Sequence, residues 1–190
     1  MDKVRIGFAV TGSFCTFKAV FPQMQKLVEQ GCRVVPIMSE HAYSTDTRFG
    51  RAADWIARAE EITGEKVIHT IAQAEPIGPK KLLDLLIVAP CTGNTLGKLA
   101  CGIYDTAPTL AVKSHRRNER PVLIAVSTND ALAMSAASIG MLQSRKGIYF
   151  VPYRQDDCVE KPASCVADFV QILPAAQAAL EGRQHQPVVF

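Results

Sequence analysis

The most constraining feature of this chain is residues 82–89, Leu-Leu-Asp-Leu-Leu-Ile-Val-Ala, where Asp84 is the one polar position. An amphipathic helix or a half-exposed strand alternates apolar and polar side chains at its own period. A parallel strand that helices cover on both faces reads instead as a continuous apolar run. The run therefore predicts a central strand of a parallel sheet.

Shorter apolar runs and segments of helical periodicity alternate around this strand. The expected strands are residues 4–10, 33–38, 82–89, 121–126 and 148–151. One expected helix runs from after Ser13 to residue 30, and another lies within residues 45–63. The other expected helices cover residues 92–101, 106–115, 131–144 and 163–181, the last with an interruption at Pro174. This alternation is typical of a three-layer, Rossmann-like α/β fold with right-handed crossovers.

Length and composition fit one domain, residues 1–190, in which residues 182–190 form a C-terminal tail. The 48% of hydrophobic residues supplies a core, and a net charge of +3 gives no general attraction to nucleic acid. No apolar stretch is long enough to span a bilayer, and no signal peptide is recognisable. The six cysteines show neither CxxC nor zinc spacing. We expect a cytoplasmic protein with reduced thiols, no metal, no nucleic-acid partner and no membrane span.

Small polar residues follow several of the predicted strands. They occur at 11–13 (Thr-Gly-Ser), 91–95 (Cys-Thr-Gly-Asn-Thr) and 127–129 (Ser-Thr-Asn), and Ser39 closes another strand. Open parallel sheets bind ligands beyond the carboxyl ends of their strands. The first loop is not a GxGxxG fingerprint, but a glycine and a hydroxyl before a helix favour a phosphate. Ordinary helix capping is the alternative, although it explains Thr92 or Asn94 and not the whole second cluster.

On these residues the chain resembles the homo-oligomeric flavin-containing cysteine decarboxylases and their relatives, the flavin prenyltransferases. Residues 11–13 match the family's TGS loop, residues 90–105 (PCTGNTLGKLACGIYD) resemble PATANTxAKxAxGxxD, and residues 126–129 stand in the place of PAMN. The resemblance implies a homo-oligomeric, commonly trimer-based flavoprotein that binds FMN. The cofactor-binding residues that it implies are Gly12, Ser13, Ser39, Thr92, Asn94, Thr95, Ser127 and Thr128. It also implies catalytic roles for Asn129 and Asn94.

Two departures separate the chain from the best-known members of this family. Decarboxylases carry a histidine shortly before the buried strand, and counting back from Asp84 places Pro76 there. His69 lies further upstream, where we expect a surface or capping role. Ser127 stands near the place of the arginine that binds phosphate in prenyltransferases. Without the histidine, the decarboxylase mechanism lacks its acid/base group.

Further phrases, at 47–50, 60–64, 74–80, 125–132 and 186–189, resemble one branch of this family. That branch implies one subunit of a two-subunit oxidoreductase, whose partner subunit is associated with NADP. It implies oxidation of a dihydropyridine dicarboxylate to the aromatic pyridine dicarboxylate in the mother cell of a sporulating bacterium. Flavin can accept the hydride in such a reaction.

A dicarboxylate substrate calls for cations in its pocket. Arg48 is the first candidate, followed by Lys113, Arg116 and Arg117, although each can equally be a solvated surface charge. Trp55 fits either a subunit boundary or ordinary core packing. Two other functions stay open: a flavin-dependent decarboxylase, and a non-catalytic protein that scaffolds the partner subunit.

Overall fold

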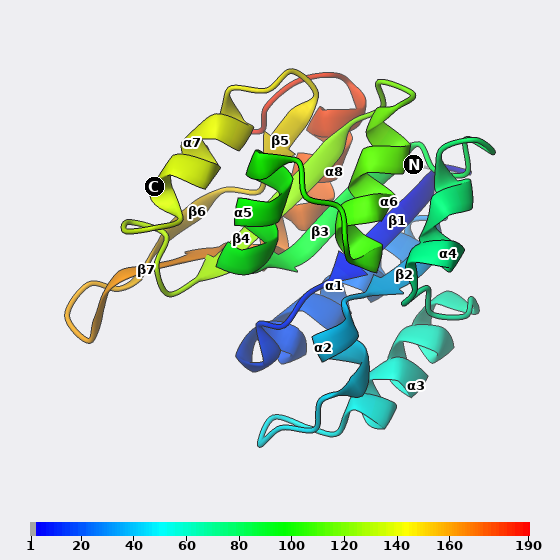
Figure 1. Ribbon diagram of the computed structural model, residues 1–190, viewed down its shortest axis with the longest axis horizontal. Coiled ribbons are helices and arrows are strands. Elements are labelled where there is room, and N and C mark those ends of the chain that lie inside the picture. The colour runs from blue at the N-terminus through cyan, green and yellow to red at the C-terminus, as the bar shows by residue number, and fades with distance from the viewer. Residues whose placement is uncertain (1–2) are drawn as a thin grey trace.

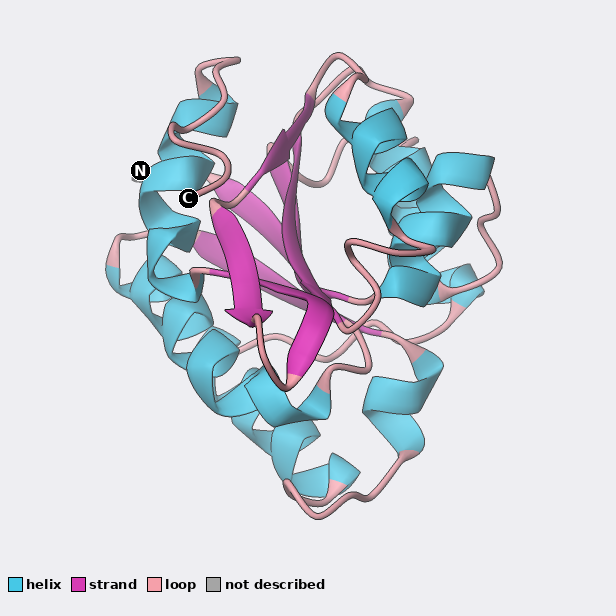
Figure 2. Ribbon diagram, turned by 90° about the vertical axis from the view of Figure 1, so that its left-hand side faces the viewer, coloured by secondary structure: helices cyan, strands magenta, loops and turns pink. Residues whose placement is uncertain are grey.

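A computed structural model of the protein describes residues 3–190 and shows a seven-stranded sheet with helices on both faces (Figures 1 and 2). The strands are β1 (Arg5–Val10), β2 (Arg33–Met38), β3 (Leu85–Cys91), β4 (Val122–Thr128), β5 (Ile148–Phe150), β6 (Tyr153–Asp157) and β7 (Lys161–Ala167). The α-helices are α1 (Phe17–Glu29), α2 (Glu40–Ser44), α3 (Ala52–Thr63), α4 (Ile71–Ala74), α5 (Gly93–Cys101), α6 (Ala107–Arg116), α7 (Ala136–Gln143) and α8 (Ile172–Leu180). Short 3-10 helices are η1 (Phe14–Thr16), η2 (Glu75–Ile77) and η3 (Phe169–Gln171).

The parallel part of the sheet has the order β2-β1-β3-β4, with β5 beside β4. The predicted α/β fold is therefore confirmed, with all five expected strands present and their ends shifted by a few residues. The central run begins at Leu85 rather than Leu82, and it continues through Pro90 and Cys91. All seven residues of β3 are buried, as the continuous apolar pattern requires.

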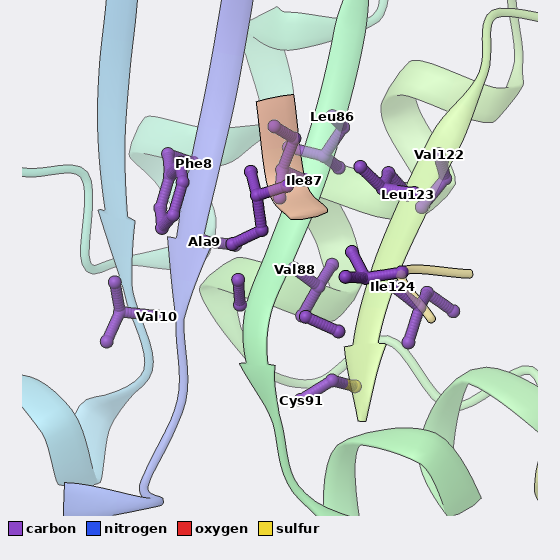
Figure 3. Packing of buried hydrophobic residues seen from close by; sticks show 14 of the residues in the cluster. Phe8, Ala9, Val10, Leu86, Ile87, Val88, Cys91, Val122, Leu123 and Ile124 are labelled. Atoms are coloured by element: carbon purple, nitrogen blue, oxygen red, sulfur yellow. The ribbon is translucent and has the colours of Figure 1, made fainter. Parts of the chain in front are cut away.

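The core forms where side chains of neighbouring strands meet under the helices. Figure 3 shows Phe8 and Val10 of β1, Ile87 and Val88 of β3, and Ile124 of β4 within one cluster, and each of them is fully buried. Burying one such side chain stabilises the fold by roughly 1.5–3 kcal/mol relative to leaving it exposed. The strand ends that carry the polar loops thus continue from strands that are anchored in the buried core.

Two helical layers cover this sheet, one on each face (Figure 2). Helix α1 packs beside α8 in one layer, whereas α5 contacts both α6 and α7 in the other. The amphipathic helix α1 ends at Glu29, and two residues later Gly31 has a φ of 82°, which suits a residue without a side chain. Within residues 3–190 no helix has the length and apolar character needed to cross a membrane.

The predicted helix 163–181 is wrong in its first part. Residues 161–167 form β7, which pairs antiparallel with β6 and with the end of β4, so the sheet is mixed rather than wholly parallel. The turn between β6 and β7 projects beyond the body of the protein (orange in Figure 1). The helical part begins after Asp168, whose carboxylate accepts a hydrogen bond from the Val170 amide.

Two other helix predictions need correction. Pro174 does not interrupt α8, because it lies in the first turn, where backbone N–H groups have no partner within the helix. The predicted helix 131–144 is shorter, because residues 131–135 form turns and α7 begins at Ala136. Residues 182–190 lie outside regular elements and return to the sheet, where Val189 bridges Tyr153.

Asp84, the one polar residue of the central run, ties the start of β3 to its neighbours. Its carboxylate accepts hydrogen bonds from the Arg5 amide at 2.9 Å and from the guanidinium groups of Arg5 and Arg120, each at 3.0 Å. Arg120 also donates to the carbonyl of Leu83. Burial raises the pKa of Asp84, but the hydrogen bonds from Arg5 and the charge of Arg120 outweigh it, so this pKa lies below the ordinary 3.8.

We predict that Asp84→Asn lowers the free energy of unfolding by about 1–2 kcal/mol near neutral pH, because it leaves Arg5 and Arg120 without their anion. A carboxylate with a depressed pKa stabilises the fold above its unfolded-state pKa and loses that effect as the pH falls through its folded-state pKa. The difference between wild type and variant should therefore shrink below about pH 4. Urea unfolding at several pH values measures it. Asp54→Asn, which breaks the exposed Arg51–Asp54 pair, is the control and should change stability little.

Candidate functional site

A pocket of about 890 Å³ lies at the carboxyl ends of β1, β3 and β4, and the β6–β7 hairpin contributes to its wall. This volume falls within the roughly 300–1,000 Å³ of small-molecule sites. All three polar loops that the sequence singled out reach it. The predicted site residues that line it are Gly12, Ser13, Thr92, Asn94, Ser127, Thr128 and Asn129.

Thr11 fixes the first loop to the second. Its buried hydroxyl donates to the carbonyl of Pro90 at 2.7 Å and accepts a hydrogen bond from the Thr92 amide at 3.1 Å. The Thr11 amide also donates to Pro90 at 3.3 Å. The ends of β1 and β3 are consequently held together by side-chain and backbone contacts. Sequence reasoning placed Thr11 in the loop but assigned it no role.

A hydroxyl pair joins the first loop to the third. The Ser13 and Ser127 oxygens lie 2.8 Å apart, although the two residues are 114 positions apart in the chain. Ser127 is buried and Ser13 is partly exposed to the pocket. The loops after β1 and β4 therefore meet across the end of β3, and a ligand in the pocket would touch both.

A second polar cluster surrounds the start of α5. The Asp130 carboxylate accepts hydrogen bonds from the hydroxyls of Thr128 at 2.6 Å and Ser135 at 2.8 Å. A Cβ atom at Gly93 would lie 2.7 Å from each of these hydroxyls and 2.8 Å from the carboxylate. Only glycine fits here without displacing the cluster. Gly93 and Asp130 both line the pocket, and neither was predicted as a site residue, because their proximity depends on tertiary packing that local spacing does not reveal.

Ser39 and Thr95 do not line the pocket. The Ser39 amide donates to the Val10 carbonyl at 3.0 Å, and its hydroxyl accepts from the Ala42 amide at the start of α2. Thr95 is buried, with its hydroxyl 3.2 Å from that of Thr92. The structure therefore places both as supports of the loops rather than as pocket walls.

Two asparagines differ from these hydroxyl groups, because their side-chain amides make no hydrogen bond within residues 3–190. Asn94 and Asn129 are exposed at the pocket, and within residues 3–190 neither side-chain amide has a hydrogen-bond partner. Phe14 and Phe49 add apolar rings to the lining. The pocket thus combines hydroxyls, free amides and aromatic faces, which together suit a ligand with a flat ring and polar edges.

The predicted cations have different positions. Arg48 lies with its guanidinium 4.8 Å from the ring centroid of Phe49, which places it at the rim and not in the lining. Lys113 lies over Tyr104, also outside the pocket.

Arg116 donates to the carbonyls of Arg120 and Lys146, near the start of β4. It therefore lies at the opposite end of the strands from the pocket.

Arg117 follows Arg116 at the end of α6 and is far from the pocket for the same reason. The substrate-binding candidates Arg116 and Arg117 are therefore not supported by their positions. Among the residues that the structure describes, the cation that does line the pocket is Lys161, at the start of β7. It was missed because its hairpin was not predicted.

Pro76 lies in η2, and His69 stacks on Tyr43 with ring centroids 3.7 Å apart. Neither lines the pocket. Trp55 packs edge-on against Phe17 and beside Phe21, which is the core position named as its alternative in the sequence. Within the described residues, no group of His, Cys, Asp or Glu is arranged to hold a metal ion.

Comparison with known proteins identifies the family to which this chain belongs. The family model described as Flavoprotein matches residues 1–174, and the chain belongs to that family. This agrees with the resemblance carried by the strand-end loops.

Within the family, the chain is 44% identical over 185 residues to the B subunit of dipicolinate synthase of Bacillus subtilis (strain 168), covering 97% of this chain and 92% of that protein. The crystal structure of the dipicolinate synthase B subunit from Bacillus halodurans C superposes with a TM-score of 0.91 at 40% identity, covering 100% and 98% of the two chains. Mouse (Mus musculus) phosphopantothenoylcysteine decarboxylase is 27% identical over 195 residues, covering 94% of this chain and 88% of that protein.

We predict that Gly93→Ala disturbs the site, because its methyl group must displace the hydroxyls of Thr128 and Ser135. Crowding of this kind typically costs about 1–3 kcal/mol of stability. Gly97→Ala is a matched control on the same helix, where nothing lies within 4 Å of the added atom. It should be neutral, or stabilising by up to about 1 kcal/mol from helix propensity. Thermal unfolding of both variants measures the difference, and equal effects would contradict the packing described.

Proposed function

We propose that this chain is the FMN-binding B subunit of dipicolinate synthase, which with an A subunit oxidises dihydrodipicolinate to dipicolinate during sporulation. The observation that carries the proposal is the pocket itself, in a chain 44% identical to the B subunit of that enzyme. The A subunit would be the one associated with NADP. The protein would act in the cytoplasm of the mother cell, as a homo-oligomer built on trimers.

The residues of the pocket fit FMN. Gly12 and Ser13 precede a helical turn, where backbone N–H groups and a hydroxyl favour a phosphate. Asn94 and Asn129 offer free amides for the polar edge of the flavin ring, and Phe14 and Phe49 offer apolar contacts. Ser39 and Thr95 would act by holding these loops.

When bound, FMN supplies hydride acceptance from the dihydropyridine ring, and aromatisation of that ring favours the transfer. The residues of this chain orient the two rings and exclude water. Asn129 and Asn94 would hydrogen-bond the flavin ring or a substrate carboxylate, which stabilises charge that develops during the transfer. Arg48, at the rim, would attract the dicarboxylate as it approaches.

The decarboxylase alternative is less well supported. Neither Pro76 nor His69 lines the pocket, so within residues 3–190 no histidine stands in it as an acid/base group. We therefore propose that the chain does not decarboxylate cysteine derivatives.

We predict that Gly12→Val abolishes FMN binding and leaves the fold intact. A Cβ at Gly12 would meet Phe14 at 3.7 Å and His41 at 3.8 Å, which are ordinary contacts, so the fold accommodates it. Because Gly12 lines the pocket, we expect the two further methyl groups of valine to occupy space at its wall. Flavin absorbance after gel filtration measures the loss, and Gly140→Val on α7, outside the pocket, is the control. Unchanged flavin affinity in a folded Gly12→Val protein would refute this placement.

A second prediction concerns Asn129. Asn129→Ala should reduce the rate of dipicolinate formation with the A subunit on the order of a hundredfold, the usual effect of losing a donor aimed at developing charge. Stability should stay the same, because the Asn129 side chain makes no hydrogen bond among the described residues. Rate and melting temperature are measured on the same preparation. A stable variant with full activity would contradict the catalytic role proposed for Asn129.

A further inference from the structure

Lys161 is the only lysine or arginine in the lining of the pocket, among the residues that the structure describes. It begins β7 and pairs with Asp156 of β6, with Nζ 2.9 Å from Oδ2. Both side chains line the pocket. The hairpin thus brings one positive and one negative charge to a wall that otherwise consists of hydroxyls, amides and apolar groups, with Asp130.

The pocket that Lys161 lines is also lined by Gly12 and Ser13 of the first loop. The hydrogen bond to Asp156 and the negative charge of that carboxylate raise the pKa of Lys161, and the charge of Asp157 adds a smaller contribution. Cys15 belongs to η1, which follows the TGS loop. Lys161 and Cys15 both line the same pocket.

The charges of the lining make Lys161 decisive for an anionic ligand. The carboxylate of Asp130 is engaged by two hydroxyls, and that of Asp156 by Lys161. Two carboxylates and one ammonium would repel an anion unless the ammonium is available to it. An ammonium has three N–H donors and gives one to Asp156, and the Lys161 side chain is 59% exposed.

We infer that Lys161 binds a carboxylate of the substrate, and that Asp156 holds the ammonium at the pocket and competes with the substrate for it. The inference rests on the proposed function, because it presumes a dicarboxylate in this pocket. A charge-assisted hydrogen bond between ammonium and carboxylate is among the stronger polar contacts available to a protein. Lys161 would therefore determine specificity for an acidic ring.

A purely structural role predicts something different. If the pair only fastened the hairpin, removing either partner would loosen β6 and β7 and would change ligand affinity in the same direction. If Lys161 binds the ligand, removing Lys161 weakens binding, whereas removing Asp156 releases the ammonium and strengthens it. The two variants thus separate the two roles.

The test uses FMN-loaded protein together with its A subunit, and calorimetric titration with pyridine-2,6-dicarboxylate. Lys161→Met should weaken binding roughly tenfold, Lys161→Arg should keep most of the affinity, and Asp156→Asn should tighten binding. Lys66→Gln removes a comparable ion pair, Lys66–Glu60, outside the pocket and should leave the affinity unchanged.

Lys161→Met and Asp156→Asn variants that shift affinity in the same direction, or not at all, would overturn the inference, as would a wild-type complex that binds no dicarboxylate. The flavin spectrum and dipicolinate formation are recorded for the same wild-type preparation. Absent flavin or absent product counts against the proposed function. If flavin binding and product formation are normal, but the affinity for pyridine-2,6-dicarboxylate does not change in the Lys161 variants, only this inference is contradicted.

Discussion

The hydroxyl of Thr11 determines how the rest of the site is arranged. It is buried between two strand ends, donates to Pro90 and accepts from Thr92, so it satisfies groups of both β3 and α5. An unpaired polar group in such a place costs roughly 1–3 kcal/mol. The end of β1 and the start of α5 therefore stay together, and Ser13 and Gly93 are fixed on the two sides of the pocket.

A change of partner along β4 supplies the other wall. Residues Val122–Ile124 pair with β5 in parallel, whereas Ser127 and Thr128 pair with β7 in the antiparallel sense. The strand that carries the third polar loop thereby also carries the hairpin. The pocket is consequently built from both parts of the mixed sheet, and its only lining cation among residues 3–190 comes from the antiparallel part.

The sequence predicted the parallel sheet well, because β1 to β5 are apolar and their loops have strong turn signals. It missed the β6–β7 hairpin, since Tyr-Arg-Gln-Asp-Asp at 153–157 has no alternating apolar pattern and shows mostly exposed residues. Lys161 and Asp156 were therefore not predicted as site residues, because both belong to that hairpin. The contacts of Gly93 with Asp130 depend on tertiary packing, which neither periodicity nor local spacing reveals. Arg116 and Arg117 were considered as substrate-binding residues because of their charge. The direction of α6 places them at the end of the strands opposite the pocket.

We propose that the pocket at the ends of β1, β3 and β4 holds FMN and serves dihydrodipicolinate oxidation. The most direct measurement is an FMN titration of the purified chain followed by absorbance, with dipicolinate formation assayed on the same protein with and without the A subunit. The account predicts saturable flavin binding with one FMN per chain, and product only when both subunits are present. A chain that binds no flavin, while the reconstituted pair still forms dipicolinate at its full rate, would contradict it.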